Sequence, residues 1–396
     1  MLCFHPIYTR EKGIRTPWYS FYASECVSFC RLQHTGYRCL LSIICSDYRW
    51  LRLSNFLEFV RHCGKMWGVM VDVIFHSFLS TIPVFIFFAI GCWLRYKKAI
   101  EPQHDNVIMQ LAMDVGYPCL IFHSIMKYMV VEAHPTMTTV GFSLQAIGCG
   151  FLEMTLGVMV AWMVARILRL RIGTGLRTFT LTAGVQNYAF FVIPIVQMLF
   201  SGSGDPTMGA LFIHNMGCEI FVWSVGVILI CGGARDLRIG LLLRGPLLAV
   251  CFSLILAWSG LGVYVAQPPI MKAAEMIGAV ATPICLILFG CSMYDLSRNF
   301  VWRPRMLAAG IITRLVLAPA VILAVAWILP VDPIIKRIMV IQSAIPSAVI
   351  PVILAKRYGG IPEIGTQILL TTTVCSFITL PIWLTVGSIY VVPLLP

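Results

Sequence analysis

Long apolar stretches recur along this chain from about residue 72 to its end, and each is close to the ~20 residues that a helix needs to cross a bilayer. Of the 396 residues, 59% are hydrophobic and 12% are charged, whereas a soluble domain has about 25% charged residues. The sequence therefore predicts an all-α membrane protein. We expect ten transmembrane helices, at residues 72–94, 106–129, 139–165, 178–200, 208–232, 241–266, 271–293, 306–329, 336–355 and 366–391.

The charges between these spans predict their orientation. Alternate loops hold fifteen Lys and Arg residues, and the remaining loops hold four. Because basic loops stay in the cytoplasm, we expect both termini on the outer side of an inner cell membrane. The net charge of +12 then reflects topology, and no nucleic-acid partner is expected.

The first 65 residues differ from the rest, because they hold six cysteines but no apolar run long enough to span a bilayer. The spacing of Cys26, Cys30 and Cys39 fits no standard zinc site. We expect residues 1–65 to be a disordered extension or a mispredicted start, and residues 66–396 to form the ten-span part. The natural start would be Met66 or Met70.

Two spans are interrupted in the middle. The fourth carries Gln186 and Asn187, followed by Pro194, and the ninth carries Pro346 and Pro351. Paired interruptions in the two halves of a chain indicate the binding site of a secondary transporter. The alternative is a pair of ordinary proline kinks, which membrane helices tolerate.

Ten spans divide into five and five, so the halves would form an inverted repeat with crossing, broken helices 4 and 9. Half-helix N-termini at such a crossing carry partial positive charge and favour an anion. The candidate substrate-binding residues are Gln186, Asn187, Tyr188, Asn215, Ser343, Pro346 and Ser347.

Ionisable residues inside spans are functional candidates, because a buried charge is costly. Glu219 lies one helical turn after Asn215 on the same face, and it and Asp114 are candidates for proton coupling. The alternative is a structural carboxyl group. His214, which precedes Asn215, is expected to point elsewhere. We expect Arg314 to pair with an intramembrane acid, the alternative being that it extends towards the interface.

No phosphate-binding loop, nucleophile elbow or pair of histidines at helical spacing is found in the sequence. We therefore expect neither an enzyme nor a metal or cofactor site.

Short motifs in a fixed order give the chain a family resemblance. They are Tyr117–Phe122, Gln186 and Asn187 with Pro194, Thr282–Pro283 with Leu288–Met293, Arg314–Pro319, Ala344–Pro346 and Thr379–Trp383. With these motifs, the chain from about Met70 onwards resembles the bacterial branch of the auxin efflux carrier family.

The resemblance implies the fold of the bile acid, arsenite and riboflavin transporters. Spans within 72–129 and 241–293 would form a scaffold, and spans within 139–232 and 306–391 a mobile transport domain. It also implies that Asn187 and Pro346 flank the substrate and that Asn215 faces it. Plant members of the family have a proline between two asparagines in span 4, and this chain lacks it.

The expected function is secondary transport of a small organic anion, similar to malate, malonate or auxin, with a proton as a candidate coupling ion. The alternatives are a sodium-coupled carrier of another solute and a non-transporting membrane sensor. The expected partners are the substrate, the coupling ion and the lipid bilayer, and family members can form homodimers.

Overall fold

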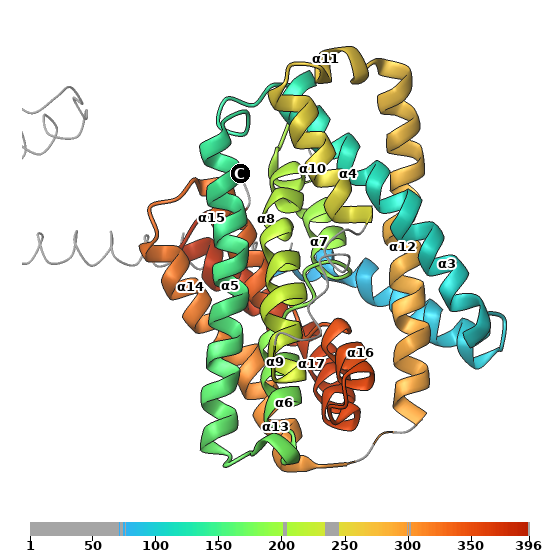
Figure 1. The fold of residues 1–396 in the computed structure, drawn as a ribbon, viewed down its shortest axis with the longest axis vertical. Helices are drawn as coiled ribbons and strands as arrows, with labels where there is room; N and C mark the ends of the chain where they lie inside the picture. Colours follow the sequence, from blue (N-terminus) through green and yellow to red (C-terminus); the bar gives the residue numbers. More distant parts are fainter. Residues whose placement is uncertain are drawn as a thin grey trace, which may run out of the picture. The chain divides into compact units, whose positions relative to one another are not determined.

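A computed structural model describes residues 71, 74–75, 77–200, 204–233, 245–298, 300 and 302–394, all within the unit Met70–Pro396. The expectations for residues 1–65, and for a start at Met66 or Met70, lie outside the described residues. The described part of the unit is built from helices, with one isolated β-bridge (Figure 1).

The helices follow one another with short connections. In chain order they are the helix Ser77–Tyr96, η2 (Pro102–His104), α3 (Asp105–Leu111), η3 (Ala112–Gly116), α4 (Tyr117–Met126), η4 (Lys127–Val131), α5 (Val140–Ile167), η5 (Ile172–Thr174), α6 (Leu176–Gly184), α7 (Val192–Leu199), α8 (Thr207–Phe221), η6 (Val222–Gly226), α9 (Val227–Cys231), α10 (Gly245–Trp258), α11 (Gly262–Val265), α12 (Pro268–Arg298), α13 (Pro304–Ile312), η9 (Thr313–Leu317), α14 (Ala318–Ile328), α15 (Pro333–Ala344), α16 (Ile350–Arg357) and α17 (Pro362–Tyr390).

Seven continuous helical segments of the described part are long and apolar enough to cross a membrane. They are Ser77–Tyr96, Pro102–Val131, Val140–Ile167, Thr207–Cys231, Pro268–Arg298, Pro304–Ile328 and Pro362–Tyr390. The remaining helices are shorter, and four of them, α6, α7, α15 and α16, are the halves of two interrupted segments. The prediction of an all-helical, multi-pass membrane protein is confirmed.

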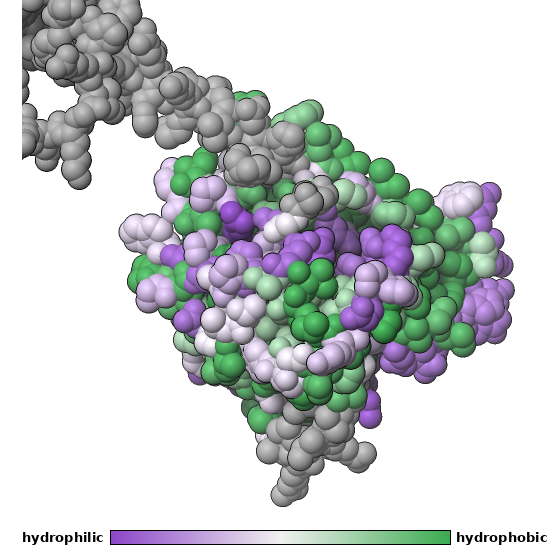
Figure 2. Space-filling model, turned by 90° about the horizontal axis from the view of Figure 1, so that it is seen from above, coloured by the Kyte–Doolittle hydropathy of each residue, from purple (hydrophilic) through white to green (hydrophobic). Residues whose placement is uncertain are grey.

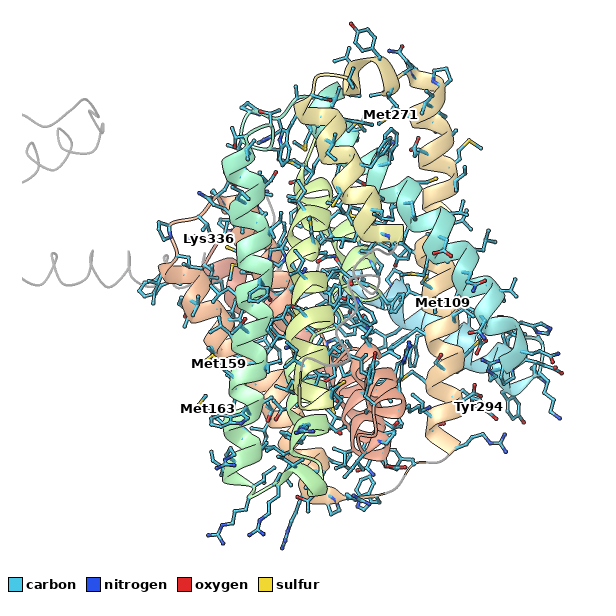
Figure 3. The ribbon with its side chains drawn as sticks, in the orientation of Figure 1. Met109, Met159, Met163, Met271, Tyr294 and Lys336 are labelled. Atoms are coloured by element: carbon cyan, nitrogen blue, oxygen red, sulfur yellow. The ribbon has the colours of Figure 1, made fainter. Side chains whose placement is uncertain are left out.

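The outer surface is strongly apolar, as lipid contact requires. Met159 and Met163 point away from α5 in Figure 3 and are 54% and 49% exposed. In the view from above, hydrophobic residues cover much of the sides, and hydrophilic residues gather between them (Figure 2). Polar side chains such as Gln186, Gln342 and Arg314 are instead fully buried between helices.

Glycines bring the backbones of α5, α6 and α8 close together. A Cβ atom on Gly150 would overlap the carbonyl oxygen of His214, and one on Gly217 would overlap the carbonyl oxygen of Ile147. One helical turn beyond Glu153, Gly157 makes the same kind of approach to the end of α6. Small residues permit such close packing in membranes, so α5 and α8 lie side by side (Figure 1).

A proline accounts for the widened turn η9 in the middle of its segment. Pro319 has no N–H to donate and would clash with the carbonyl group of Leu315, four residues earlier. The π-helical turn Thr313–Leu317 relieves the clash. The indole Nε1–H of Trp383, on α17, donates to the freed oxygen of Leu315 at 2.7 Å. The same turn carries Arg314 into the protein interior, where it is 0% exposed.

Candidate functional site

The two interrupted segments break at similar places. The first is non-helical between Gly184 and Val192, and the second between Ala344 and Ile350. Pro194 and Pro351 lie in the first turns of α7 and α16, where a missing N–H costs nothing because that group has no partner within the helix. The break in span 4 therefore precedes Pro194.

The two breaks cross and bond to each other through their backbones. The N–H of Asn187 donates to the oxygen of Pro346 at 2.9 Å, and the N–H of Ala348 donates to the oxygen of Val185 at 3.0 Å. The result is an isolated antiparallel bridge. The bridge thereby pairs backbone N–H and carbonyl groups of the two breaks, which would be costly to leave unpaired in the membrane interior.

Arg314 lies at the C-terminal ends of the two half-helices that enter the crossing. Its guanidinium group donates to the backbone oxygens of Ser343 (2.7 Å), Ile345 (2.9 Å), Gln342 (3.3 Å) and Gly184 (3.4 Å), and to the side-chain oxygen of Gln186 (3.4 Å). Each helix C-terminus carries about half a negative charge. The ends of α6 and α15 together therefore balance one guanidinium.

This arrangement adds to the expectation for Arg314, which interacts electrostatically with the acid Glu153 but hydrogen-bonds to other groups. Its hydrogen-bond partners are carbonyl and amide oxygens rather than the oxygens of an acid, and it does not extend to the interface, because it is fully buried. The physical reason is that two helix ends together supply the negative charge that a carboxylate would otherwise supply.

The other side of the crossing faces the N-termini of α7 and α16 and has two polar atoms without partners among the described residues. The side-chain oxygen of Asn187 accepts from the N–H of Phe190 at 3.1 Å. Its Nδ2 has no hydrogen-bond partner in the described part of the chain, and the residue is 2% exposed. The hydroxyl oxygen of Ser347 is also buried and unpartnered. The backbone N–H of Ser347 donates to Thr372 at 3.3 Å.

A network of side chains connects this crossing to α8. Gln342 Nε2 donates to Asn215 Oδ1 at 2.6 Å and lies 3.3 Å from His214 Nδ1. Its Oε1 accepts from Gln186 Nε2 at 3.3 Å. Asn215 Nδ2 in turn donates to the backbone oxygen of Tyr188 at 2.9 Å. Gln342 therefore joins both breaks to α8.

A partly open cavity adjoins this network. One wall is formed by the first break with α7 and α8, and includes Tyr188, Asn215 and Glu219. The opposite wall consists of residues of η3, α4 and α10, among them Tyr117 and Val250. Glu219 Oε2 accepts from the indole Nε1–H of Trp223 at 2.6 Å.

Glu219 lines the cavity, and the other candidate residues fall into three groups. Gln186, Asn187, Tyr188, Pro346 and Ser347 meet at the crossing, and Asn215 lies against it. The hydroxyl of Ser343 instead donates to Val340 of its own helix at 2.7 Å, and its backbone oxygen binds Arg314. Asp114 lies apart, on an exposed face of η3.

Sequence reasoning missed the central position of Gln342 and the contact that His214 makes. His214 faces Glu153 of α5, with Nε2 and Oε2 3.5 Å apart, and does not line the cavity with Asn215 and Glu219. Gln342 stands immediately before the interrupted stretch that begins at Ser343. An amide in an apolar segment next to a helix break was the available signal.

A comparison with known proteins identifies the family of this chain. The chain matches the family described as membrane transport protein over residues 76–240 and 234–384. A comparison with the curated proteins finds no match. The family match covers most of the chain, including both breaks, the crossing and Arg314. The chain therefore belongs to the membrane transport protein family, the family of the auxin efflux carriers, and is a multi-pass membrane transporter.

Proposed function

We propose that this transporter is a secondary carrier of a small organic anion, with the substrate bound where the two broken segments cross. The observation that carries this proposal is the difference between the two sides of the crossing. The negative helix ends are occupied by Arg314. The positive ends of α7 and α16 adjoin two unpartnered polar atoms, on Asn187 and Ser347.

Electrostatics therefore favours an anion over a cation at this crossing. Carbonyl oxygens at helix ends are the groups that bind sodium in carriers with broken helices, and here a guanidinium already takes them. The N-termini of α7 and α16 remain to attract a carboxylate. This argues against the sodium-coupled alternative, while the paired breaks argue against a sensor that has lost transport.

The ten-span, five-plus-five architecture belongs to the same proposal. The interrupted segments correspond to spans 4 and 9, and their antiparallel crossing is what an inverted repeat would produce. The cavity lies between the proposed scaffold, represented by α4 and α10, and the proposed transport domain, represented by α7 and α8. Transport would proceed by movement of the second group relative to the first.

Glu219 lines this cavity and limits which anions can bind. An ionised carboxylate beside an anion would repel it, so we propose that Glu219 is neutral while substrate is bound. Tyr117, Tyr188 and Asn215 supply the other polar groups of a mostly apolar wall. These groups suit a small acid with an apolar part as well as a dicarboxylate.

The proposed site is tested by uptake of radiolabelled malate, malonate, lactate and indole acetate into vesicles that contain the purified protein. We expect one of these acids to accumulate faster than in empty vesicles, independently of sodium. Uptake that requires a sodium gradient would support the sodium-coupled alternative instead. The absence of uptake, together with the absence of thermal stabilisation by any of the acids, would support the sensor.

The orientation in the membrane is part of the proposal as well. The basic loops predict both termini on the outside of the inner membrane. Attachment of a membrane-impermeant reagent to a cysteine introduced at Glu363, an exposed residue at the start of α17, would test it. Glu363 lies in a loop that is predicted to be cytoplasmic, so a cysteine there should react with the reagent only after the membrane is opened.

A further inference from the structure

We propose that Glu153 and His214 form a buried proton-binding site behind the substrate site, with the exchangeable proton on Glu153. This inference rests on the proposed anion transport for its role, but not for its existence. Glu153 and His214 face each other from α5 and α8, and the side chains of both are 0% exposed. Neither had been assigned to the site from its sequence position.

The pair is brought together by backbone packing. Gly150 lies one turn before Glu153 on α5, and it touches the backbone at His214. The close approach places Glu153 Oε2 3.5 Å from His214 Nε2. Both carboxyl oxygens of Glu153 lie in the interior without a hydrogen bond from another described residue.

Burial explains why this pair holds a proton. The side chains of Glu153 and His214 are 0% exposed, and neither carboxyl oxygen of Glu153 has a hydrogen bond from a described residue. The guanidinium of Arg314 interacts with Glu153 electrostatically but hydrogen-bonds to the ends of α6 and α15 instead. An ionised carboxylate without hydrogen bonds is costly in the membrane interior.

The hydrogen bonds around His214 place the proton on Glu153. Gln342 Nε2 lies 3.3 Å from His214 Nδ1 and can only donate to it. The imidazole is then neutral, with its own proton on Nε2, which faces Glu153. The additional proton of the pair therefore belongs to the carboxyl group of Glu153.

Other titratable groups around the pair do not replace this proton. Arg314, Cys149 and Cys218 are the side chains that interact electrostatically with Glu153. Glu219 lies one residue beyond Cys218 and lines the cavity. Helix α14 carries no charged residue. The charged residues of α6 and α15 lie within the first five residues of each helix, at the ends away from the crossing: Arg177, Lys336 and Arg337. On the far side of α8, α4 and α10 contribute Tyr117, Cys119, His123 and Cys251.

The proton is coupled to the substrate site through two amides. Gln342 touches His214 on one side and donates to Asn215 Oδ1 on the other, and Asn215 lines the cavity. An anion at the nearby N-termini of α7 and α16 adds negative charge, which makes a proton on Glu153 more favourable. By linkage, a proton on Glu153 must strengthen anion binding to the same extent.

The existence of the site can be measured without knowing the substrate. Infrared spectra of the purified protein should show the band of a protonated carboxylic acid that disappears as the pH is raised. Glu153→Gln should remove this band, because glutamine keeps the shape of the side chain but cannot titrate. Glu363→Gln, which alters an exposed carboxyl group, should leave it in place. His214→Asn should shift the pH at which the band disappears.

Two results would overturn the inference. One is a wild-type spectrum identical to that of Glu153→Gln at every pH. The other is a Glu153 band that persists to strongly alkaline pH, which would make the acid a permanently neutral structural group. The coupling is then measured as thermal stabilisation by malonate and by indole acetate. We expect stronger stabilisation at acid than at alkaline pH in the wild type, and a smaller difference in Glu153→Gln, in which only Glu219 must still be neutral for an anion to bind.

These readouts separate the two proposals. If no acid stabilises the wild-type protein but the infrared band titrates, anion binding fails and the proton site remains. If an acid binds with the same pH dependence in Glu153→Gln as in the wild type, the proton site fails and the carrier remains.

Discussion

Replacing Arg314 with methionine removes the charge that holds two helix ends together and keeps a side chain of similar length. Five oxygen acceptors lose their donor. At about 0.6 kcal/mol for each hydrogen bond in a membrane protein, the loss is about 3 kcal/mol. This agrees with the ~3–5 kcal/mol cost of leaving a buried charge pair half complete, and it corresponds to more than a hundredfold change in the unfolding equilibrium.

The assay is denaturant unfolding of the purified protein in detergent. Arg305→Met is the control, because Arg305 is exposed in the first turn of α13 and should contribute little. We expect Arg314→Lys to recover part of the loss, since lysine keeps the charge but cannot match the fork of a guanidinium. Sodium ions should stabilise Arg314→Met more than the wild type, because the freed oxygens can then bind a cation.

If Arg314→Met proves as stable as Arg305→Met, the reasoning about the helix ends is refuted. The same follows if sodium stabilises the wild type as strongly as the variant, because the oxygens at the crossing would then be open to a cation while Arg314 is present.

Three other substitutions test separate parts of the structure. Asn187→Ala should abolish vesicle uptake while the protein stays folded; full uptake would remove the crossing from the site. Gly217→Ala should lower the free energy of unfolding by about 1–3 kcal/mol, because its Cβ would overlap the backbone of α5. Gly148→Ala, at a position with open space, should leave the free energy of unfolding unchanged. Equal thermal midpoints for Gly217→Ala and Gly148→Ala would contradict the close approach of α5 and α8. Trp383→Phe should cost about 1–3 kcal/mol in denaturant unfolding, because the oxygen of Leu315 loses its donor; an unchanged midpoint would mean that this oxygen finds another partner.

The sequence predicted the parts of this protein that depend on local chemistry. Apolar length and charge indicated membrane helices, and Gln186, Asn187 and Pro346 marked the interruptions. The helical spacing of Asn215 and Glu219 placed them on one face, and both line the same cavity. These features follow from rules that hold within one segment.

What the sequence could not provide depends on how segments pack. Arg314 was expected to need an acid, because the two helix ends that surround it come from distant parts of the chain. His214 was judged by its neighbours on α8, whereas its contacts come from Glu153 and Gln342 on other helices. The contact between His214 and Glu153 depends on glycines that bring α5 and α8 close together. No pattern within a single segment encodes that packing.

The bonds made by Arg314 also constrain the order in which the protein can be assembled. Gly184, whose oxygen it binds, precedes it by 130 positions in the chain. During synthesis, the end of α6 therefore enters the membrane long before its donor has been made. Until the second half arrives, the oxygen of Gly184 lacks the donor that it has in the folded protein. Completion of the crossing is thus a late event in biogenesis, because the second break, with Pro346 and Ala348, is made later still.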